Sequence, residues 1–355
     1  MKILELTPNL KVGGAETFVV NISNAFVDNG HECKVTTLFD PENDDFLISK
    51  LNGSVEIGSL GKSRGLDLKC FFKVCNDIRK YKPDVVHAHI GAITYLLISS
   101  VFIRSCKYYV TIHSDARREA GNWFTRIIRR FLFKFNFVLP VTISPESRDS
   151  FLDFYKKTPE LIFNGVPDAK VSLYETYDRL VFVHPASCQP VKNQRLLFSA
   201  FSEVAKKYPN IELHWYGSHS PYEILFNELN PFIGDHIIYK GIVPDIRKYL
   251  KNARAMCLSS NMEGMPMTII EAMSVGCISI ATPVGGCVNM IDDGINGFLS
   301  SDMSVESYRS TLEKVIEMSV VELEQMRVAA RESYEQHYTI EKTAQSYIDL
   351  FNNYC

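Results

Sequence analysis

The sequence predicts a two-domain α/β protein in which each domain is built on a mostly parallel sheet. A chain of 355 residues with 46% hydrophobic residues is long enough to form two domains, each with a core of its own. Short apolar stretches alternate with amphipathic ones, which predicts strands and helices in turn, and this alternation occurs twice. The polar stretch Ala169 to Asp178 separates the two series and indicates a linker.

The first half of the chain begins with a buried strand, a glycine-containing loop and a helix that ends near Asn29. The predicted strands are Lys2 to Thr7, Glu32 to Phe39, residues 83–89, Tyr108 to His113, Val138 to Ser144 and Leu161 to Val166. Further predicted helices are Leu68 to Tyr81, Ile90 to Ile103 and Trp123 to Phe135. The apolar run Ile90 to Ile103 spans 14 residues, too few to cross a bilayer, so a core helix is expected.

The second half repeats the pattern from Leu180 onward. Its predicted strands are Leu180 to His184, Ile211 to Tyr216, Ile237 to Tyr239, Ala255 to Leu258 and Cys277 to Ala281. Its predicted helices are Asn193 to Lys207, Tyr222 to Asn230, Pro244 to Asn252, one that ends at Gly276, and a final helical region that closes with Ile340 to Tyr354. We expect domains over residues 1–168 and 169–336, with a C-terminal helix over 337–355 that could cross back to the first domain. A cleft between two such domains is the default place for a ligand.

Composition excludes some classes of function. The net charge is −3, which argues against a protein that binds nucleic acid along its whole length. The nine cysteines show no C-x-x-C pair, and Cys33, Cys106, Cys257 and Cys277 lie in apolar surroundings, which is typical of buried reduced thiols in a cytoplasmic protein. The N-terminus enters a strand that carries Glu5, so no signal peptide is expected.

The stretch from Ser259 to Gly276 is the most informative part of the sequence. It predicts a loop that turns into a helix, with Pro266 at the first helical position and Gly276 as a left-handed stop. The start of a helix offers unpaired N–H groups and a partial positive charge, which suit a phosphate. Glu263 in the loop and Glu271 on the helix would accept hydrogen bonds from hydroxyls beside that phosphate. A nucleotide sugar is a ligand with both kinds of group.

The first half offers weaker candidates at the carboxyl ends of its strands, where α/β proteins place ligands. The loop Lys11 to Glu16 contains Gly13-Gly14 and suggests an anion site or a close backbone approach, but the dinucleotide fingerprint G-x-G-x-x-G is absent. His113 ends a strand and is a site candidate. For His87 and His89, packing at a strand end and function both remain open.

The segment Arg117 to Phe135 combines basic and aromatic residues. Arg126, Arg129, Arg130 and Lys134 alternate with tryptophan and phenylalanine, a pattern known from helices that lie on membrane surfaces. An ordinary surface helix whose aromatic side chains face the core explains the pattern equally well. Peripheral contact with an anionic membrane is therefore one of two open interpretations.

The motifs together resemble glycosyltransferase family four, whose members have the GT-B architecture of two Rossmann-like domains facing a deep interdomain cleft. The central motif is the pair Glu263 and Glu271 with seven residues between them. The accompanying matches occur in family order along nearly the whole chain: Gly13-Gly14-Ala15-Glu16, residues 82–89, Thr111-Ile112-His113, Asn164-Gly165-Val166, Lys192-Asn193, Gly241 to Val243, Gly276, Thr282-Pro283, Gly285-Gly286, and Asp293-Gly294 with Gly297.

The resemblance implies retaining transfer of a sugar from a UDP- or GDP-sugar to a hydroxyl of a glycan or lipid-linked acceptor, in surface polysaccharide or glycolipid assembly. No metal and no other cofactor is expected. The catalytic residues would be His113, Lys192 and Glu263, with Lys192 on the diphosphate and Glu263 on hydroxyls of the donor sugar. Donor-binding residues would be Gly14, Val243, Gly264, Met265, Pro266, Met267, Thr268 and Glu271. In this family the leaving phosphate oxygen is usually held to take the proton of the acceptor, so no protein base is required.

Two positions depart from the family pattern. Members commonly carry an arginine five residues before the lysine, and this chain has Ser187 there. Arg195 or the other domain could supply the missing charge. The position of a common acid after the paired glycines is Asn289, outside the presumed chemistry.

Two other functions remain as alternatives: a sugar-nucleotide epimerase of the same architecture, and a catalytically silent protein that binds nucleotide sugars. A phosphorylase would need a lysine for pyridoxal phosphate, and the sequence gives no evidence of one. We expect a cytoplasmic protein, with attachment at the inner face of the membrane if the segment Arg117 to Phe135 serves as a surface anchor. The donor sugar, the acceptor and the linkage are not encoded in these motifs.

Overall fold

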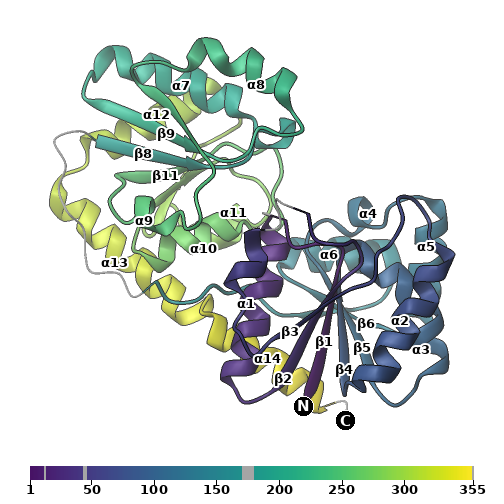
Figure 1. Cartoon of the computed structure of the whole chain (residues 1–355). Helices are drawn as coiled ribbons and strands as arrows, with labels where there is room; N and C mark the ends of the chain where they lie inside the picture. The colour runs from purple at the N-terminus through teal and green to yellow at the C-terminus, as the bar shows by residue number, and fades with distance from the viewer. Residues whose placement is uncertain (12, 43–45, 170–179, 354–355) are drawn as a thin grey trace. The chain divides into compact units, whose positions relative to one another are not determined.

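The computed structural model describes residues 1–11, 13–42, 46–169 and 180–353 and consists of two compact units (Figure 1). The first unit is Met1–Pro167 together with Thr339–Cys355, and the second is Asp168–Tyr338. Most of the predicted linker, from residue 170 to Asp178, lies outside the described residues. Each unit has a parallel sheet covered by helices on both faces, so the predicted fold class of two Rossmann-like α/β domains is confirmed.

The first unit contains a seven-stranded parallel sheet in the order β3-β2-β1-β4-β5-β6-β7. Its strands are β1 Lys2–Thr7, β2 Glu32–Thr37, β3 Glu56–Ser59, β4 Val85–His89, β5 Lys107–Ile112, β6 Leu139–Thr142 and β7 Glu160–Leu161. Its helices are α1 Gly14–Asp28, α2 Leu68–Tyr81, α3 Leu97–Phe102, α4 Ala116–Glu119, α5 Trp123–Lys134, α6 Pro145–Tyr155 and α14 Ile340–Asn353, with 3₁₀ turns η1 Phe46–Lys50 and η2 Ile90–Leu96.

The two faces of this sheet follow from the alternation of side chains along each strand. Ile3 and Val85 belong to a core that also contains buried residues of α1 and α14. Leu4 and Val86, one position further along, belong to a second core built with α2, α5 and α6. The last helix therefore completes the first unit, although 171 residues of the second unit precede it in the chain.

The second unit contains a six-stranded parallel sheet in the order β10-β9-β8-β11-β12-β13. Its strands are β8 Leu180–Pro185, β9 Ile211–Tyr216, β10 Ile237–Gly241, β11 Ala255–Leu258, β12 Ser279–Ala281 and β13 Gly297–Leu299. Its helices are α7 Gln194–Lys207, α8 Glu223–Leu229, α9 Arg247–Leu250, α10 Met267–Ser274, α11 Cys287–Met290, α12 Val305–Glu317 and α13 Val320–His337, with 3₁₀ turns η3 Pro190–Lys192 and η4 Asn230–Phe232. Trp215 of β9 is fully buried in the core, where its ring contacts Phe198 of α7 and Phe226 of α8.

Some predicted elements were wrong in extent or kind. The strand predicted over Leu161 to Val166 ends at Leu161, because the chain then turns to meet α14, where the carbonyl of Val166 accepts a hydrogen bond of 3.0 Å from the N–H of Ile340. The helix predicted over Ile90 to Ile103 is a 3₁₀ turn followed by the short α3, and Ile90 has a left-handed φ of 54° that interrupts regular structure. The helix predicted over Pro244 to Asn252 is only Arg247–Leu250.

Several elements were missed altogether. They include β3, β13, α4, α6 and α11. The start of α6 carried a readable signal, since Ser144 caps the helix by accepting from the N–H of Ser147 at 3.2 Å and Pro145 occupies the first turn.

The eight described cysteines are free and buried, as the apolar surroundings of four of them predicted. Burial raises the pKa of Cys277 to about 11, with smaller opposing effects, so this thiol stays protonated at neutral pH.

Candidate active site

The second sheet changes its direction of winding between β8 and β11, which are neighbours although β9 and β10 intervene in the chain. Ligands of doubly wound sheets bind outside the carboxyl ends of the strands at such a point. Here the loops that follow β8 and β11 meet, and they carry Lys192 and Glu263.

Lys192 ends the turn η3 and is held by backbone contacts to the loop that follows β11. The hydroxyl of Ser259 donates to the carbonyl of Lys192 at 2.9 Å, and the N–H of Asn261 donates to the carbonyl of Val191 at 2.7 Å. Asn193 follows with a left-handed φ of 46°, a conformation that asparagine tolerates well. The two loops therefore form one structural unit that fixes the lysine.

Glu263 and Lys192 form an ion pair at the centre of this unit. The Nζ of Lys192 lies 2.7 Å from Oε1 of Glu263, and the side chains are 24% and 10% exposed. Ser260 donates a second hydrogen bond of 2.5 Å to the same carboxylate oxygen. The pair is largely buried, and its hydrogen bonds hold one cation and one acceptor in fixed positions.

The helix α10 begins immediately after this pair, one residue later than predicted. Met267 is its first residue, and Pro266 occupies the capping position with an extended ψ of 109°. The N–H of Ile269 bonds to the carbonyl of Pro266 at 3.0 Å, so by helix geometry the N–H groups of Met267 and Thr268 have no acceptor within the helix. The predicted stop is confirmed, since Gly276 has a left-handed φ of 63°.

The paired glycines after β12 hold the Glu263 loop from the other side. Gly286 donates its N–H to the carbonyl of Gly264 at 2.9 Å. A Cβ placed on Gly285 would lie 1.9 Å from the carbonyl oxygen of Glu263, and one on Gly286 would lie 2.1 Å from that of Gly264. Backbone meets backbone here, so only glycine fits.

Glu271 lies on the second turn of α10 and is partly exposed. Burial alone would lower the pKa of Arg247 on α9, but the hydrogen bonds that Arg247 donates to Asp245, the charge of Asp245 and, to a smaller extent, the charge of Glu271 raise that pKa. The neighbouring loop that precedes α9 contains Val243, also partly exposed. The structure thus places the two predicted nucleoside contacts, Glu271 and Val243, on adjacent segments of the second unit.

The position of the absent family arginine is occupied by a small hydrogen-bonded side chain. Gln189 donates to the hydroxyl of Ser187 at 2.9 Å. Arg195, proposed above as a substitute cation, lies 3.2 Å from Glu228 of α8 and is 59% exposed.

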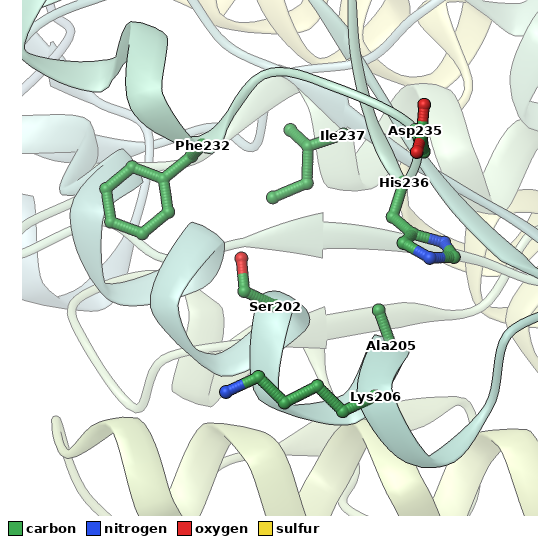
Figure 2. A pocket seen from close by; sticks show the side chains of 7 residues that line it. All are labelled: Ser202, Ala205, Lys206, Phe232, Asp235, His236 and Ile237. Carbon is green, nitrogen blue, oxygen red and sulfur yellow. The ribbon is translucent and has the colours of Figure 1, made fainter.

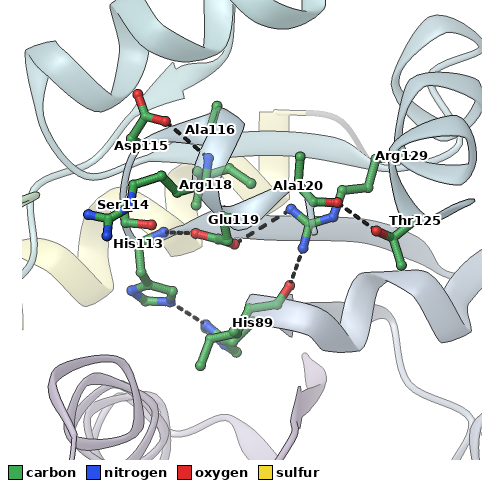
Figure 3. A network of polar contacts seen from close by, with 12 residues as sticks. His89, His113, Ser114, Asp115, Ala116, Arg118, Glu119, Ala120, Thr125 and Arg129 are labelled. Atoms are coloured by element: carbon green, nitrogen blue, oxygen red, sulfur yellow. Dashed lines mark hydrogen bonds and ion pairs between the residues drawn. The ribbon is translucent and has the colours of Figure 1, made fainter. Parts of the chain in front are cut away.

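In the first unit, His113 follows β5 and is held at both its backbone and its ring (Figure 3). Its backbone N–H donates to Glu119 of α4 at 2.9 Å, and its Nε2 lies 3.1 Å from Nδ1 of His89. The ring of Phe18 from α1 meets the His113 ring edge-on, with centroids 5.6 Å apart. Gly14, the other candidate of this unit, is the exposed first residue of α1 at the carboxyl end of β1.

Glu5, His87 and His89 form the one group of potential metal ligands found among the described residues. Their ligand atoms lie within 4.8 Å of one another, and all three side chains are fully buried. The same atoms are joined by hydrogen bonds, from Nδ1 of His87 to Glu5 at 3.1 Å and from Nε2 of His89 to Glu5 at 2.5 Å. Sequence reasoning missed Glu5 as a functional candidate.

A surface pocket of about 250 Å³ lies elsewhere in the second unit (Figure 2). It is lined by Ser202, Ala205, Lys206, Phe232, Asp235, His236 and Ile237. These residues surround the end of α7 and the start of β10, which is the amino end of the sheet. Ligands of parallel sheets bind at the opposite end, so this pocket is not the candidate site.

The helix α5 displays an apolar stripe on its surface. Trp123, Ile127, Phe131 and Phe135 recur every fourth residue along the helix and its cap, and their exposed fractions are 73%, 57%, 37% and 55%. Phe133, by contrast, is buried in the core. The aromatic side chains of this segment therefore divide between the surface and the core.

One basic residue of this segment was assigned to the wrong face. Arg129 is 1% exposed, donates to the carbonyl of Ile90 at 2.8 Å and lies 3.7 Å from Glu119 (Figure 3). Burial of the helix face toward η2 and α4 places it inside, where it supports the residue that holds the His113 backbone. Arg126, Arg130 and Lys134 remain exposed beside the apolar stripe.

The described helices include none with the length and apolar character needed to cross a membrane.

Comparison with known families identifies the class of this protein. Residues 168–333 match the family model described as glycosyl transferases group 1, and residues 12–170 match the model described as glycosyltransferase family 4. The chain has two Rossmann-like domains, and the two family models between them cover most of both. It belongs to glycosyltransferase family four, the group-one glycosyl transferases, as its motifs predicted.

Individual relatives are distant. An uncharacterized glycosyltransferase of Methanocaldococcus jannaschii is 23% identical over 61% of this chain and 59% of its own length. A lipopolysaccharide 1,6-galactosyltransferase of Escherichia coli is 28% identical over 52% of this chain and 53% of its own length. The chain thus spans little more than half the length of these two curated relatives.

Solved structures resemble the whole chain. HepE of Anabaena in complex with UDP has a TM-score of 0.83 at 20% identity and covers 99% of this chain and 100% of its own. HepE in complex with UDP-glucose has a TM-score of 0.82 at 19% identity, with the same coverage. At these identities the likeness establishes the fold.

Proposed function

We propose that this protein is a retaining glycosyltransferase that uses a nucleotide-diphosphate sugar, either a UDP- or a GDP-sugar, as donor. The acceptor is a hydroxyl of a glycan or lipid-linked glycan in surface polysaccharide or glycolipid assembly. The observation that carries the proposal is the Lys192–Glu263 pair at the start of α10, at the point where the second sheet reverses its winding.

In this proposal the second unit supplies the contacts to the donor. The start of α10, with Gly264, Met265, Met267 and Thr268, would bind the diphosphate through backbone N–H groups, and Lys192 would add a positive charge. Glu263 would accept hydrogen bonds from hydroxyls of the sugar. Glu271 would do the same for the ribose, and the backbone at Val243 would meet the base.

In the proposed reaction the bond from the anomeric carbon to the diphosphate breaks and a bond to the acceptor oxygen forms on the same face. The acceptor proton passes to the departing phosphate oxygen. The transition state resembles an oxocarbenium ion beside a growing negative charge. Lys192 and the start of α10 stabilise that negative charge, and we propose that the reaction requires no divalent cation.

Roles for the first unit are part of the proposal. His113 would contact the donor close to the reacting carbon, and Gly14 would allow the backbone to approach the phosphates or the acceptor.

The relatives favour a nucleotide-sugar donor and a role in surface polysaccharide assembly. HepE was crystallised with UDP and UDP-glucose, and the E. coli relative is named a lipopolysaccharide galactosyltransferase.

Transfer can be tested by incubating the purified protein with UDP- and GDP-sugars and lipid-linked or oligosaccharide acceptors, with and without EDTA. We expect release of the nucleoside diphosphate that depends on the acceptor and that EDTA does not abolish. We also expect a glycosidic product whose NMR coupling constant shows the anomeric configuration of the donor. An inverted product would refute retention. An epimerase would convert the donor without an acceptor, and a binding protein would release no nucleotide from any donor.

Glu271→Ala should weaken donor binding by about 1–3 kcal/mol, because the ribose hydroxyls lose their acceptor in a partly enclosed site. Isothermal calorimetry with UDP or the preferred donor measures the loss directly. Glu324→Ala, at an exposed glutamate on α13, is the matched control and should bind the donor as the unmodified protein does. Equal donor affinity in Glu271→Ala would contradict the assigned contact.

We also propose that α5 attaches the protein to the inner face of an anionic membrane. Its apolar stripe is exposed, and Arg126, Arg130 and Lys134 flank that stripe with positive charge. An apolar face beside basic residues suits the boundary between acyl chains and anionic headgroups. A lipid-linked acceptor would be presented at the same surface.

Reversing the charge of Arg126, Arg130 and Lys134 to glutamate should lower sedimentation with phosphatidylserine vesicles at least about tenfold, since each basic residue contributes about 1 kcal/mol. The charge-matched control reverses three exposed lysines of the second unit, Lys206, Lys240 and Lys314. Equal sedimentation of the two triple variants, or binding to neutral vesicles alone, would remove the membrane proposal.

A further inference from the structure

A continuous chain of hydrogen bonds links a buried carboxylate of β1 to His113. The two oxygens of Glu5 contact Nδ1 of His87 at 3.1 Å and Nε2 of His89 at 2.5 Å. On the far side of the His89 ring, Nδ1 lies 3.1 Å from Nε2 of His113. Figure 3 shows the rings of His89 and His113 directed at each other.

The sheet register builds this chain at the carboxyl ends of three neighbouring strands. Glu5 of β1 is paired with His87 of β4, and His89 of β4 is paired with Thr111 of β5. The first sheet, like the second, reverses its winding between these strands, since β1 and β4 are neighbours. The chain of polar groups therefore ends at the place where a doubly wound sheet binds its ligand.

The network is shielded from water on the face that α1 and α14 cover. Glu5, His87 and His89 are fully buried. Phe18 of α1 packs edge-on against the rings of His89 and His113, with centroid distances of 6.0 and 5.6 Å. Tyr347 of α14 lies over His87, at a centroid distance of 4.9 Å.

The protonation states along the chain follow from these contacts. Burial alone would raise the pKa of Glu5, but the attraction and hydrogen bonds of His87 and His89 outweigh it and lower the pKa to about 2. An ionised carboxylate only accepts hydrogen bonds, so His89 donates from Nε2. Burial and the neighbouring His87 lower the pKa of His89 to about 4, so at neutral pH its other nitrogen, Nδ1, carries a lone pair.

The same reasoning fixes His113. The lone pair on Nδ1 of His89 requires a donor, and that donor is Nε2–H of His113. Burial, followed by the charges of His89 and His87, lowers the pKa of His113 well below its ordinary value. The ring is therefore neutral, and its Nδ1 is a hydrogen-bond acceptor.

We propose that Glu5 and His89 are positioning residues that hold His113 in its Nε2–H tautomer, so that Nδ1 accepts a hydrogen bond from a hydroxyl of the bound substrate. The inference rests on the proposed function of His113 and sharpens it. A ring in this state orients a hydroxyl of the sugar and does not act as a cation toward the diphosphate. Stabilisation of the leaving group is then left to the second unit.

The tautomers can be read by long-range ¹H–¹⁵N NMR of protein labelled at histidine, with His113 assigned by comparison with His113→Gln. In the unmodified protein we expect His89 and His113 both as neutral Nε2–H tautomers at pH 7. Glu5→Gln should shift His113 toward a mixture of tautomers, because the amide group can donate as well as accept. A His113 that is charged or protonated at Nδ1 in the unmodified protein would overturn the inference.

Kinetics supply a second readout. Glu5→Gln and His89→Phe should lower kcat by roughly tenfold to a hundredfold while the KM for the donor changes less, since orientation of the reacting groups is lost. His87→Gln is the matched control, because it also removes a partner of Glu5 but lies outside the path to His113. Thermal denaturation checks that each variant is folded. If Glu5→Gln does not fold, the tautomers of His89 and His113 in the unmodified protein test the inference.

The outcomes separate this inference from the proposed function. If the unmodified protein transfers sugar, and the His113 tautomer and kcat are unchanged in Glu5→Gln and His89→Phe, the positioning role of Glu5 and His89 is refuted and the proposed function stands. Absence of transfer with every donor would refute the function, while the NMR spectra would still report whether the chain from Glu5 to His113 exists.

Discussion

Lys192→Ala should lower kcat by about 10²–10³-fold while the affinity for the donor falls much less. In the proposed reaction the positive charge of Lys192 faces a diphosphate whose negative charge grows as the sugar leaves, so its contribution is larger in the transition state than in the bound donor. In the free protein this lysine is paired with Glu263 at 2.7 Å, which holds it in place before the donor arrives. Steady-state kinetics together with calorimetric donor binding separate the two effects.

A charge-retaining variant and a control variant show whether the effect of Lys192→Ala is due to the lost charge at this position. Lys192→Arg keeps the charge and should recover part of the turnover, although a guanidinium does not reproduce a compact ammonium. Lys206→Ala removes an exposed lysine at the other end of the same βα unit and should match the unmodified protein. A loss of donor affinity with normal turnover would assign Lys192 to donor binding alone.

Gly285→Ala should reduce donor affinity and destabilise the second unit by at least about 2 kcal/mol, because added atoms would overlap the backbone of the Glu263 loop. Its φ of +48° is left-handed, and the new Cβ would lie 1.9 Å from the carbonyl oxygen of Glu263. The loop has to move, and Glu263 moves with it. Calorimetric donor binding and thermal unfolding measure the two consequences.

Gly294→Ala distinguishes the steric overlap from backbone strain. Gly294 also has a left-handed φ, of +78°, but a Cβ there meets nothing within 4 Å. This control should lose about 1 kcal/mol of stability and bind the donor normally. If Gly285→Ala binds the donor as tightly as the control does, the close approach of the two loops is not required for the site.

Local sequence determined much of the fold, because apolar side chains recur with different periods in strands and in helices. The strands β1, β9 and β11 and the helix α2 have the bounds that were predicted. Short edge elements escaped, since the three residues of β13 and the four of β3 are too few to show a pattern. Ile90 to Ile103 was misjudged because apolar content does not reveal the left-handed φ of Ile90.

Membership of the family was also legible in the sequence, since its motifs consist of glycines and acids at fixed spacings. The packing of the fold explains why two of these positions hold glycine. Gly285 and Gly286 have to be glycines because they pack against the backbone of residues 263 and 264. The sequence contained this requirement, but only the fold shows which segment imposes it.

Arg129 and Glu5 show what the sequence left undecided. Arg129 stands among basic residues of an amphipathic helix and is nevertheless buried, since the packing of α5 against η2 and α4 turns that position inward. Glu5 is a single acid in an apolar strand. Its partner is set by strand register, which pairs Glu5 with His87, a residue 82 positions away in the chain.

The sequence by itself therefore determined two α/β domains, a loop that turns into a helix with Glu263 before it and Glu271 on it, and membership of glycosyltransferase family four. These properties depend on residues close together in the chain, where spacing is visible. Only the tertiary structure decided which cation meets Glu263 and which carboxylate stands behind His113. Those partners come from separate strands or from the loops that follow them, and parallel strand pairing, which follows from packing across the whole sheet, brings them together.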